Sequence, residues 1–163
     1  MYSNRLHDVM KKITIYTDGA CINNPGAGGW AAILIYKQFK KEIFGGCEST
    51  TNNRMEITGL IEALERLTEP CEVDVFSDSR YVVDSMNLSR MDEWHTRGWK
   101  KKNNSPVPNS DLWIKLYDLS KIHNIKCHWV KGHSDNVLNN RCDELAESQA
   151  RLYHMNKNNL HKM

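Results

Sequence analysis

Three strand-like segments precede the first helix-like segment of this sequence, and each later strand follows a helix. Alternating β-branched residues mark the strands, and apolar residues three and four apart mark the helices. Short turns make the first three strands an antiparallel meander, whereas helical crossovers make strands 1, 4 and 5 parallel. We therefore expect an α/β fold with a five-stranded mixed sheet flanked by helices. The expected elements are strands over 12–18, 28–37, 41–50, 72–78 and 125–130, and helices over 54–67, 79–87, 111–123 and 140–153.

The chain of 163 residues has the length of one domain. We expect a single domain over residues 1–163, with a core over about 12–153, a short N-terminal extension and a polar, frayed C-terminal tail. Residues 88–109 are polar and basic and end in NSPVPNS, so they are expected to form a loop. No run approaches eighteen apolar residues, and the N-terminus lacks the apolar segment of a secretory signal. These features predict a cytoplasmic protein without a membrane span.

The cysteines and the charges narrow the possible classes of protein only slightly. The five cysteines are odd in number and widely spaced, which argues against a zinc site and against a disulfide framework. The formal net charge of +2 is too small to indicate a nucleic-acid partner. Locally, however, Lys100, Lys101 and Lys102 follow Trp94 and Trp99. Basic residues among aromatic ones suit a surface that contacts a nucleic-acid backbone, although a solvated lysine run explains them equally well.

Four carboxylates fall at positions that could converge. Asp18 ends the first expected strand and Asp78 the fourth, at the end of the sheet where open α/β folds place their sites. Each aspartate alone is more simply explained as a strand-ending or helix-capping residue. Glu56 lies at the edge of the apolar stripe of its helix, where an uncompensated carboxylate is costly. Asp143 likewise shares a side of the last helix with small apolar residues, Ala146 and Ala150, whereas Glu144 and Glu147 project elsewhere.

A cluster of carboxylates at one end of a sheet must either take up protons or bind a cation. Two unit charges 4 Å apart repel by about 4 kcal/mol at an effective dielectric constant of 20. Oxygen ligands favour Mg²⁺ or Mn²⁺ over zinc. Two such ions about 3.5–4 Å apart activate a water and stabilise the leaving oxygen in phosphoryl displacement.

Six segments resemble type 1 ribonuclease H in its bacterial form, in the order of that family: YTDGACINNPGAGGWA, TTNNRMEI, SDSRYV, RGWKKK, DLWIKL and WVKGHSDNVLNNRCDELA. They extend from about residue 12 to residue 153. The resemblance implies the ribonuclease H-like fold and a monomeric endonuclease that cleaves the RNA strand of an RNA–DNA hybrid, leaving 3′-hydroxyl and 5′-phosphate ends. It also implies two Mg²⁺ ions, which Mn²⁺ can replace, held by Asp18, Glu56, Asp78 and Asp143.

Two further residues acquire roles through the resemblance, His133 in catalysis and Asn139 in substrate binding. His133, in KGHS, matches a mobile-loop histidine that moves protons or assists product release, and an imidazole with its ordinary pKa near 6.5 suits either task. Taken alone, His133 would be a surface residue. Asn139 matches an asparagine associated with that loop, and taken alone it would be an N-cap or turn residue for the last helix.

The resemblance also implies contacts with the hybrid. Amide side chains can donate to and accept from 2′-hydroxyl groups in the minor groove, which distinguishes RNA by its sugar. Thr51 matches a contact to a DNA phosphate, and TTNNR also reads as a helix start with an N-cap. The residues that match minor-groove positions are Cys21, Asn24, Asn52 and Asn53, and those of the basic protrusion are Trp94, Trp99, Lys100 and Lys101.

The chain departs from the bacterial pattern at several of these contacts. Arg80 replaces an amide that contacts the RNA strand, and a guanidinium could still bind a phosphate or base edge with different geometry. The protrusion has one extra residue, lacks an aromatic residue near Ser89 or Arg90, and carries negative charge at Asp92 and Glu93. We therefore expect weaker binding there. Cys127 stands where the family often has tryptophan, which is expected to loosen the local packing.

The glycine-rich stretch over residues 16–30 raises the alternative of a phosphate-binding loop. A helix should follow such a loop, and here a strand is expected, so we interpret the glycines as residues that permit a tight turn and close approach of the hybrid's backbone. Two other functions remain open. A strand-transferring nuclease of the same fold would have other carboxylate spacings, and a catalytically silent hybrid-binding module would gain nothing from four carboxylates near phosphates.

Overall fold

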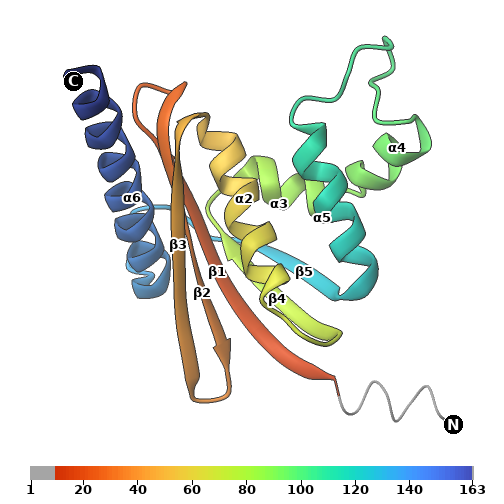
Figure 1. The fold of residues 1–163 in the computed structure, drawn as a ribbon. Coiled ribbons are helices and arrows are strands. Elements are labelled where there is room, and N and C mark those ends of the chain that lie inside the picture. The colour runs from red at the N-terminus through yellow and green to blue at the C-terminus, as the bar shows by residue number, and fades with distance from the viewer. Residues whose placement is uncertain (1–9, 163) are drawn as a thin grey trace, which may run out of the picture.

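The protein, described here by a computed structural model over residues 10–162, is built around a mixed sheet (Figure 1). The order of strands in the sheet is β3-β2-β1-β4-β5. The strand β2 pairs antiparallel with both β1 and β3, whereas β4 pairs parallel with β1 and with β5. The predicted meander and the predicted parallel strands are therefore confirmed. The strands are β1 (Lys11–Cys21), β2 (Gly26–Tyr36), β3 (Phe39–Thr50), β4 (Cys71–Ser77) and β5 (Asn124–Trp129).

Helices cover both faces of the sheet (Figure 1). One face carries the long helix α6, which packs on β1, β2 and β3. On the other face α2 packs against β1 and β2, and α5 packs against α2. No helix within residues 10–162 is both long enough and apolar enough to cross a membrane. The helices are α2 (Asn52–Glu65), α3 (Arg80–Asn87), α4 (Arg90–Thr96), α5 (Ser110–Ile122) and α6 (Val137–Lys162).

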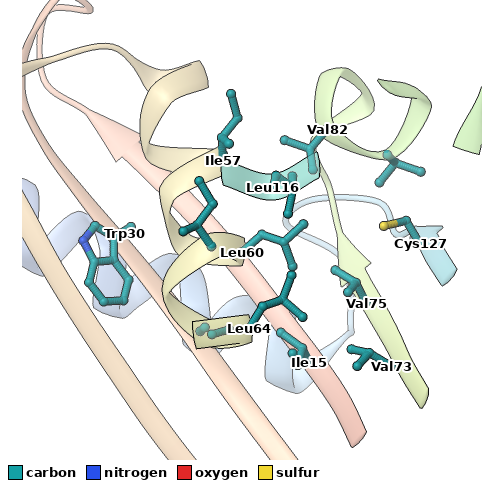
Figure 2. Close-up of a cluster of buried hydrophobic side chains, with 14 of the residues drawn as sticks. Ile15, Trp30, Ile57, Leu60, Leu64, Val73, Val75, Val82, Leu116 and Cys127 are labelled. Carbon is teal, nitrogen blue, oxygen red and sulfur yellow. The ribbon is translucent and has the colours of Figure 1, made fainter. Parts of the chain in front are cut away.

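The main core lies between the sheet and α2. Figure 2 shows Leu60 and Leu64 of α2 directed toward Ile15 of β1 and Val75 of β4. These four side chains are fully buried, as the alternation along each strand predicts. A smaller core joins Ala31 and Ile33 of β2 to the small residues of α6, which allow that helix to lie close to the sheet. Cys127 is buried in the main core, and looser packing around it stays a prediction.

Two predicted irregular segments are helical in the structure. Within the expected loop over 88–109, the segment 90–96 forms α4, because Met91 is buried and Trp94 packs against Trp113 with ring centroids 5.5 Å apart. The expected frayed tail continues α6 as far as Lys162. The segment 137–162 contains neither glycine nor proline, so no residue breaks the helix after its packed part ends. Residues 1–9 of the expected N-terminal extension lie outside the described residues.

Candidate active site

Strand register places two aspartates side by side. Tyr16 of β1 and Phe76 of β4 are the last parallel pair, and Asp18 and Asp78 each follow two residues later. Both side chains therefore leave the sheet at equivalent positions. Asp18 does not end its strand, because β1 keeps its antiparallel partner β2 and continues to Cys21 after the pairing with β4 has stopped.

The third carboxylate reaches this point through the start of α2. Thr51 caps the helix, its hydroxyl accepting a hydrogen bond from the backbone N–H of Arg54 at 3.2 Å, as predicted for an N-cap. Glu56 lies in the second turn and is only 4% exposed, so the edge of the apolar stripe on which it lies is buried. A Cβ atom on Gly19 would lie 2.5 Å from the backbone nitrogen of Glu56. Glycine at this position is therefore what allows α2 to begin so close to β1.

Asp18, Glu56 and Asp78 form a compact cluster of oxygen atoms. One carboxylate oxygen from each lies within 4.8 Å of the other two. The backbone N–H of Gly19 donates to Asp18 Oδ1 at 2.8 Å, but Asp18 Oδ2 and Glu56 Oε2 are buried without a hydrogen-bond partner. Buried carboxylate oxygens without partners are strongly unfavourable unless a cation or a proton compensates them. The donor set consists of oxygen alone, so the residues fit a hard divalent cation such as Mg²⁺ or Mn²⁺.

The pKa values of the cluster also indicate that a cation or protons compensate its buried carboxylates. Burial, with the charge of Asp78 adding to it, raises the pKa of Asp18 to about 8. Burial and the charge of Asp18 raise the pKa of Glu56 well above its ordinary value. Burial also raises the pKa of Asp78, although the nearby Asn139 amide opposes the change. Without a cation the cluster therefore holds protons near neutral pH, and a bound cation would take their place.

Asp143 lies at the same cavity but outside the three-residue cluster. The cavity has a volume of about 440 Å³, and its lining includes all four carboxylates and His133. Asp143 Oδ2 is 3.7 Å from Nδ1 of His133, whose side chain is 80% exposed. The backbone of His133 has a positive φ of 54°, and a Cβ on the neighbouring Gly132 would lie 2.6 Å from Asp78 Oδ2. The loop that carries the histidine is therefore seated directly against the carboxylates.

Asn139 is a buried residue of α6 and does not cap that helix. The alternative in which Asn139 is an N-cap is wrong, because the helix begins at Val137 and the side chain of Asn136 accepts a hydrogen bond from the backbone N–H of Asn139 at 3.0 Å. The Asn139 amide lies close enough to lower the pKa of Asp78, yet neither of its polar atoms has a direct hydrogen-bond partner. Its position beside Asp78 supports a role at the site.

Four of the predicted minor-groove residues gather beside the carboxylates. Cys21 and Asn52 line the cavity. The side chain of Asn24 accepts a hydrogen bond from the backbone N–H of Asn52 at 3.0 Å, which ties the loop after β1 to the start of α2. Asn53 is the exposed neighbour of Asn52. The structure thus brings Cys21 and Asn52 to the cavity, with Asn24 bonded to Asn52 and Asn53 next to it in the chain.

The predicted basic protrusion lies away from the cavity, on the segment that includes α4. Trp94 and Trp99 are partly buried and pack against the main core, so part of their function is to hold this segment in place. Lys100 and Lys101 are exposed. Asp92, expected to weaken binding by its negative charge, lies 3.5 Å from Lys121 and is partly compensated.

The sequence interpretation missed one carboxylate at the cavity. Glu147 was expected to project elsewhere, but it lines the cavity together with Asp143. The spacing of four residues between them was the available signal, because positions i and i+4 share a helix face. Backbone positions of the lining, such as Gly19 and Ala20, carry no side-chain signal and could not have been found in this way.

Comparisons with known proteins agree on one family. The family model described as RNase H matches residues 10–151. The protein named Ribonuclease H from Prosthecochloris aestuarii is 54% identical over 136 residues, which cover 83% of this chain and 93% of that protein. The Ribonuclease H of Acetivibrio thermocellus is 54% identical over 140 residues, which cover 86% of this chain and 95% of that protein.

Solved structures give the same result. LC9-RNase H1, described as a type 1 RNase H with the type 2 active-site motif, has a TM-score of 0.78 and 28% identity and covers 87% of this chain and 73% of that chain. LC11-RNase H1, solved in complex with RNA/DNA hybrid, has a TM-score of 0.64 and 25% identity. It covers 85% of this chain and 96% of that chain. With most of its length matched by the family model and by relatives of more than half identity, this chain belongs to the ribonuclease H family.

Proposed function

We propose that the chain is an endonuclease that hydrolyses the RNA strand of RNA–DNA hybrids and leaves 3′-hydroxyl and 5′-phosphate ends. The observation that carries the proposal is the meeting of three carboxylates from three separate elements, two of which keep a buried oxygen without a partner. Membership of the ribonuclease H family, with a relative solved on RNA/DNA hybrid, supports the substrate class. We further propose that residues 1–163 act as one domain, as a monomer and in the cytoplasm.

Asp18, Glu56, Asp78 and Asp143 would hold two Mg²⁺ ions, which Mn²⁺ could replace. When bound, such ions supply a nucleophilic hydroxide and Lewis-acid stabilisation of the leaving oxygen. Asp18 has the central position, because the charges of both other aspartates act on it. Glu56 approaches from the α2 side, from which it would orient the attacking water. Asp143, at the rim of the cavity, would complete the second cation site.

His133 would move a proton or assist product release. Its exposed ring and its place on a loop outside the regular elements leave it free to approach and leave the reacting groups. Its Nδ1 lies 3.7 Å from Asp143 Oδ2, within reach of the proposed metal ligands. Asn139 would oppose protonation of Asp78, since its amide counteracts part of the rise that burial causes in the pKa of that carboxyl.

Recognition of the hybrid would rely on sugar and phosphate contacts. Cys21, Asn24, Asn52 and Asn53 would meet the minor groove, where amides can pair with 2′-hydroxyl groups. Thr51 would contact a DNA phosphate, and Arg80 would contact the RNA strand. The protrusion would hold the flanking duplex through Trp94, Trp99, Lys100 and Lys101. Sequence preference should be slight and the salt dependence of binding steep, because these contacts are to the backbone.

A panel of labelled duplexes tests the proposal. With Mg²⁺ present we expect cutting of the RNA strand in the hybrid, at many positions, and no cutting of double-stranded RNA or double-stranded DNA. The fragments should carry 5′-phosphate and 3′-hydroxyl ends. Equal cutting of hybrid and double-stranded RNA would overturn the substrate assignment. Binding of the hybrid without any cutting would instead identify a silent binding module.

A further inference from the structure

We propose that Trp129 is a positioning residue for the substrate, because its indole holds the Arg80 guanidinium beside Asp78 as a contact to an RNA-strand phosphate. The proposal rests on the proposed function and deepens it, since it names the residue through which Arg80 acts. The matching segment WVKGHSDNVLNNRCDELA begins with Trp129, but the resemblance assigns this residue no role. The geometry around the end of β5 points to one.

The two side chains form a stacked pair. The Cζ atom of Arg80 lies 3.8 Å from the centroid of the Trp129 ring, a close distance for a cation over an aromatic face. A guanidinium stacked in this way keeps its N–H groups directed outward in its own plane, where they remain available to an acceptor. The stack therefore fixes the plane of Arg80 without using its hydrogen bonds.

The indole is itself fixed to the active site. Trp129 is the last residue of β5 and pairs in parallel register with Ser77, the residue before Asp78. Its ring nitrogen donates a hydrogen bond to the backbone carbonyl of Asp78 at 3.1 Å. A residue that touches both Arg80 and the backbone of a proposed metal ligand sets the distance between the guanidinium and the carboxylate cluster.

Helix stability does not explain the cation at this position. Arg80 is the first residue of α3, and a positive charge at a helix N-terminus opposes the helix dipole. Ser79 already caps the helix, its hydroxyl accepting from the backbone N–H of Val82 at 3.2 Å. By contrast, Arg54 and Arg141 are bonded to carboxylates, and the ion pairs found within residues 10–162 include none for Arg80. Arg80 is exposed, and Asp78 and Ser79 just before it line the cavity.

A phosphate of the hybrid would be the anion that pairs with Arg80. A phosphodiester backbone that enters the cavity must pass close to the start of α3, because Ser79 belongs to the lining. A guanidinium there can bind a phosphate through two parallel N–H groups. Because the stack holds that plane before the hybrid arrives, less side-chain entropy is lost on binding. The contact is to a phosphate, so it should raise affinity for the RNA strand without adding sequence preference.

Binding of uncut hybrid separates this role from catalysis. In an Asp18→Asn background, Kd is measured as a function of salt for Arg80→Gln, Trp129→Leu, Trp129→Phe and the double variant Arg80→Gln/Trp129→Leu. Loss of one phosphate contact should weaken binding by about five- to tenfold and reduce the salt slope by about 1. We expect this loss for Arg80→Gln and for Trp129→Leu, no further loss in the double variant, and a smaller loss for Trp129→Phe, which keeps an aromatic face but not the hydrogen bond to Asp78. Arg66→Gln, which removes a cation paired with Glu62 on α2, is the matched control and should change neither quantity.

The kinetics of cleavage complete the test. In the otherwise unaltered chain, Arg80→Gln should raise KM and leave kcat nearly unchanged, because the phosphate contact acts equally on bound substrate and transition state. If Trp129→Leu weakens binding by the same factor whether Arg80 is present or replaced, the ring does not act through Arg80 and the proposal is wrong. Normal affinity of Arg80→Gln would also overturn it. Failure of the unaltered chain to cut would contradict the proposed function instead, and the binding series would still report on the stack.

Discussion

Asp18 interacts electrostatically with each of the other three carboxylates proposed as metal ligands. It is 2% exposed, and one of its oxygens has no hydrogen-bond partner. A buried carboxylate among like charges stabilises neither the strand nor the core. The proposed metal site would explain its position.

Replacing this carboxylate by its neutral isostere should make the metal-free protein more stable. For Asp18→Asn we expect the free energy of unfolding in EDTA at pH 7.5 to rise by about 1–2 kcal/mol, because the neutral amide needs neither the proton uptake nor the buried charge that the carboxylate requires on folding. Denaturant unfolding followed by circular dichroism measures the difference. Asp74→Asn, at an exposed position earlier in β4, is the control. A metal-free Asp18→Asn protein less stable than the unaltered chain would contradict the electrostatic account.

Replacing His133 should change the rate of cleavage and not the binding of the cation. We expect His133→Ala to slow turnover by about 10²-fold, the usual range for a proton-transfer group. Binding of Mn²⁺, measured by calorimetry, should be unchanged, because the ring approaches Asp143 only at 3.7 Å from an exposed loop. An unaltered turnover rate would make the histidine a bystander.

The sequence predicts which carboxylates meet better than it predicts how deeply each is buried. The four carboxylates were identified from strand ends and helix faces, and the structure places all four at one cavity. A helical wheel gives the direction of Glu56 but not its depth, which depends on how closely Gly19 lets α2 approach β1. Trp129 looked like an ordinary strand residue, since its partners Arg80 and Asp78 are distant in sequence.

At the scale of elements, the strands and their relative directions follow from the sequence pattern. Alternation and crossover rules are properties of the pattern, and β1 to β5 obey them. The two missed helical segments depend on other information. The short helix α4 exists through tertiary packing of Met91 and Trp94, which overrides its polar composition. The end of α6 continues a helix that is already packed, so it needs no apolar stripe of its own.

The last turns of α6 should therefore be dispensable. Residues 154–162 are largely exposed, whereas Ala146 and Ala150 before them are buried against β2. We expect a chain that ends after Tyr153 to keep its cleavage rate and to change its free energy of unfolding by less than about 0.5 kcal/mol. Ala150→Leu, which overpacks the same helix, should by contrast lose about 1–3 kcal/mol. A large loss of stability or activity on truncation would show that the end of α6 contributes contacts that its exposure does not indicate.

At the scale of the whole molecule, the carboxylate cluster should make the free energy of unfolding depend on pH and on bound metal. The pKa of Asp18 is about 8 in the folded chain and 3.8 ordinarily, so the folded state binds a proton that the unfolded state has released. The stabilisation that this proton gives to the folded state is fully present below pH 3.8 and is lost as pH rises through about 8. Burial lowers the pKa of His123, and that group destabilises the fold only as pH falls below its ordinary 6.5. Burial also raises the pKa of four thiols above their ordinary 9.0, so they add a slope of the same sign as pH approaches 9: Cys21, Cys71, Cys127 and Cys142. The window from pH 6.5 to 7.5 therefore isolates the cluster.

In that window the metal-free chain should become less stable as pH rises, with a slope of up to about 1.4 kcal/mol per pH unit for one proton. Saturating Mg²⁺ should abolish the slope, because the cation replaces the proton and binds only the folded state. Unfolding curves in EDTA and in Mg²⁺ at several pH values measure this, and Asp18→Asn should show a flatter slope in EDTA. Stability that rises with pH in EDTA would contradict the predicted protonation.

The most direct test of the account is the rate at which the chain cuts the RNA strand of an end-labelled hybrid, measured for the unaltered chain and for Asp18→Asn with Mg²⁺ and with EDTA. We predict rapid cutting by the unaltered chain with Mg²⁺, none with EDTA, and a loss of at least about 10³-fold for Asp18→Asn with Mg²⁺, consistent with removal of a central catalytic group. Asp74→Asn should cut normally. Cutting that survives EDTA, or a normal rate in Asp18→Asn, would show that the carboxylate cluster is not the metal-dependent catalytic centre.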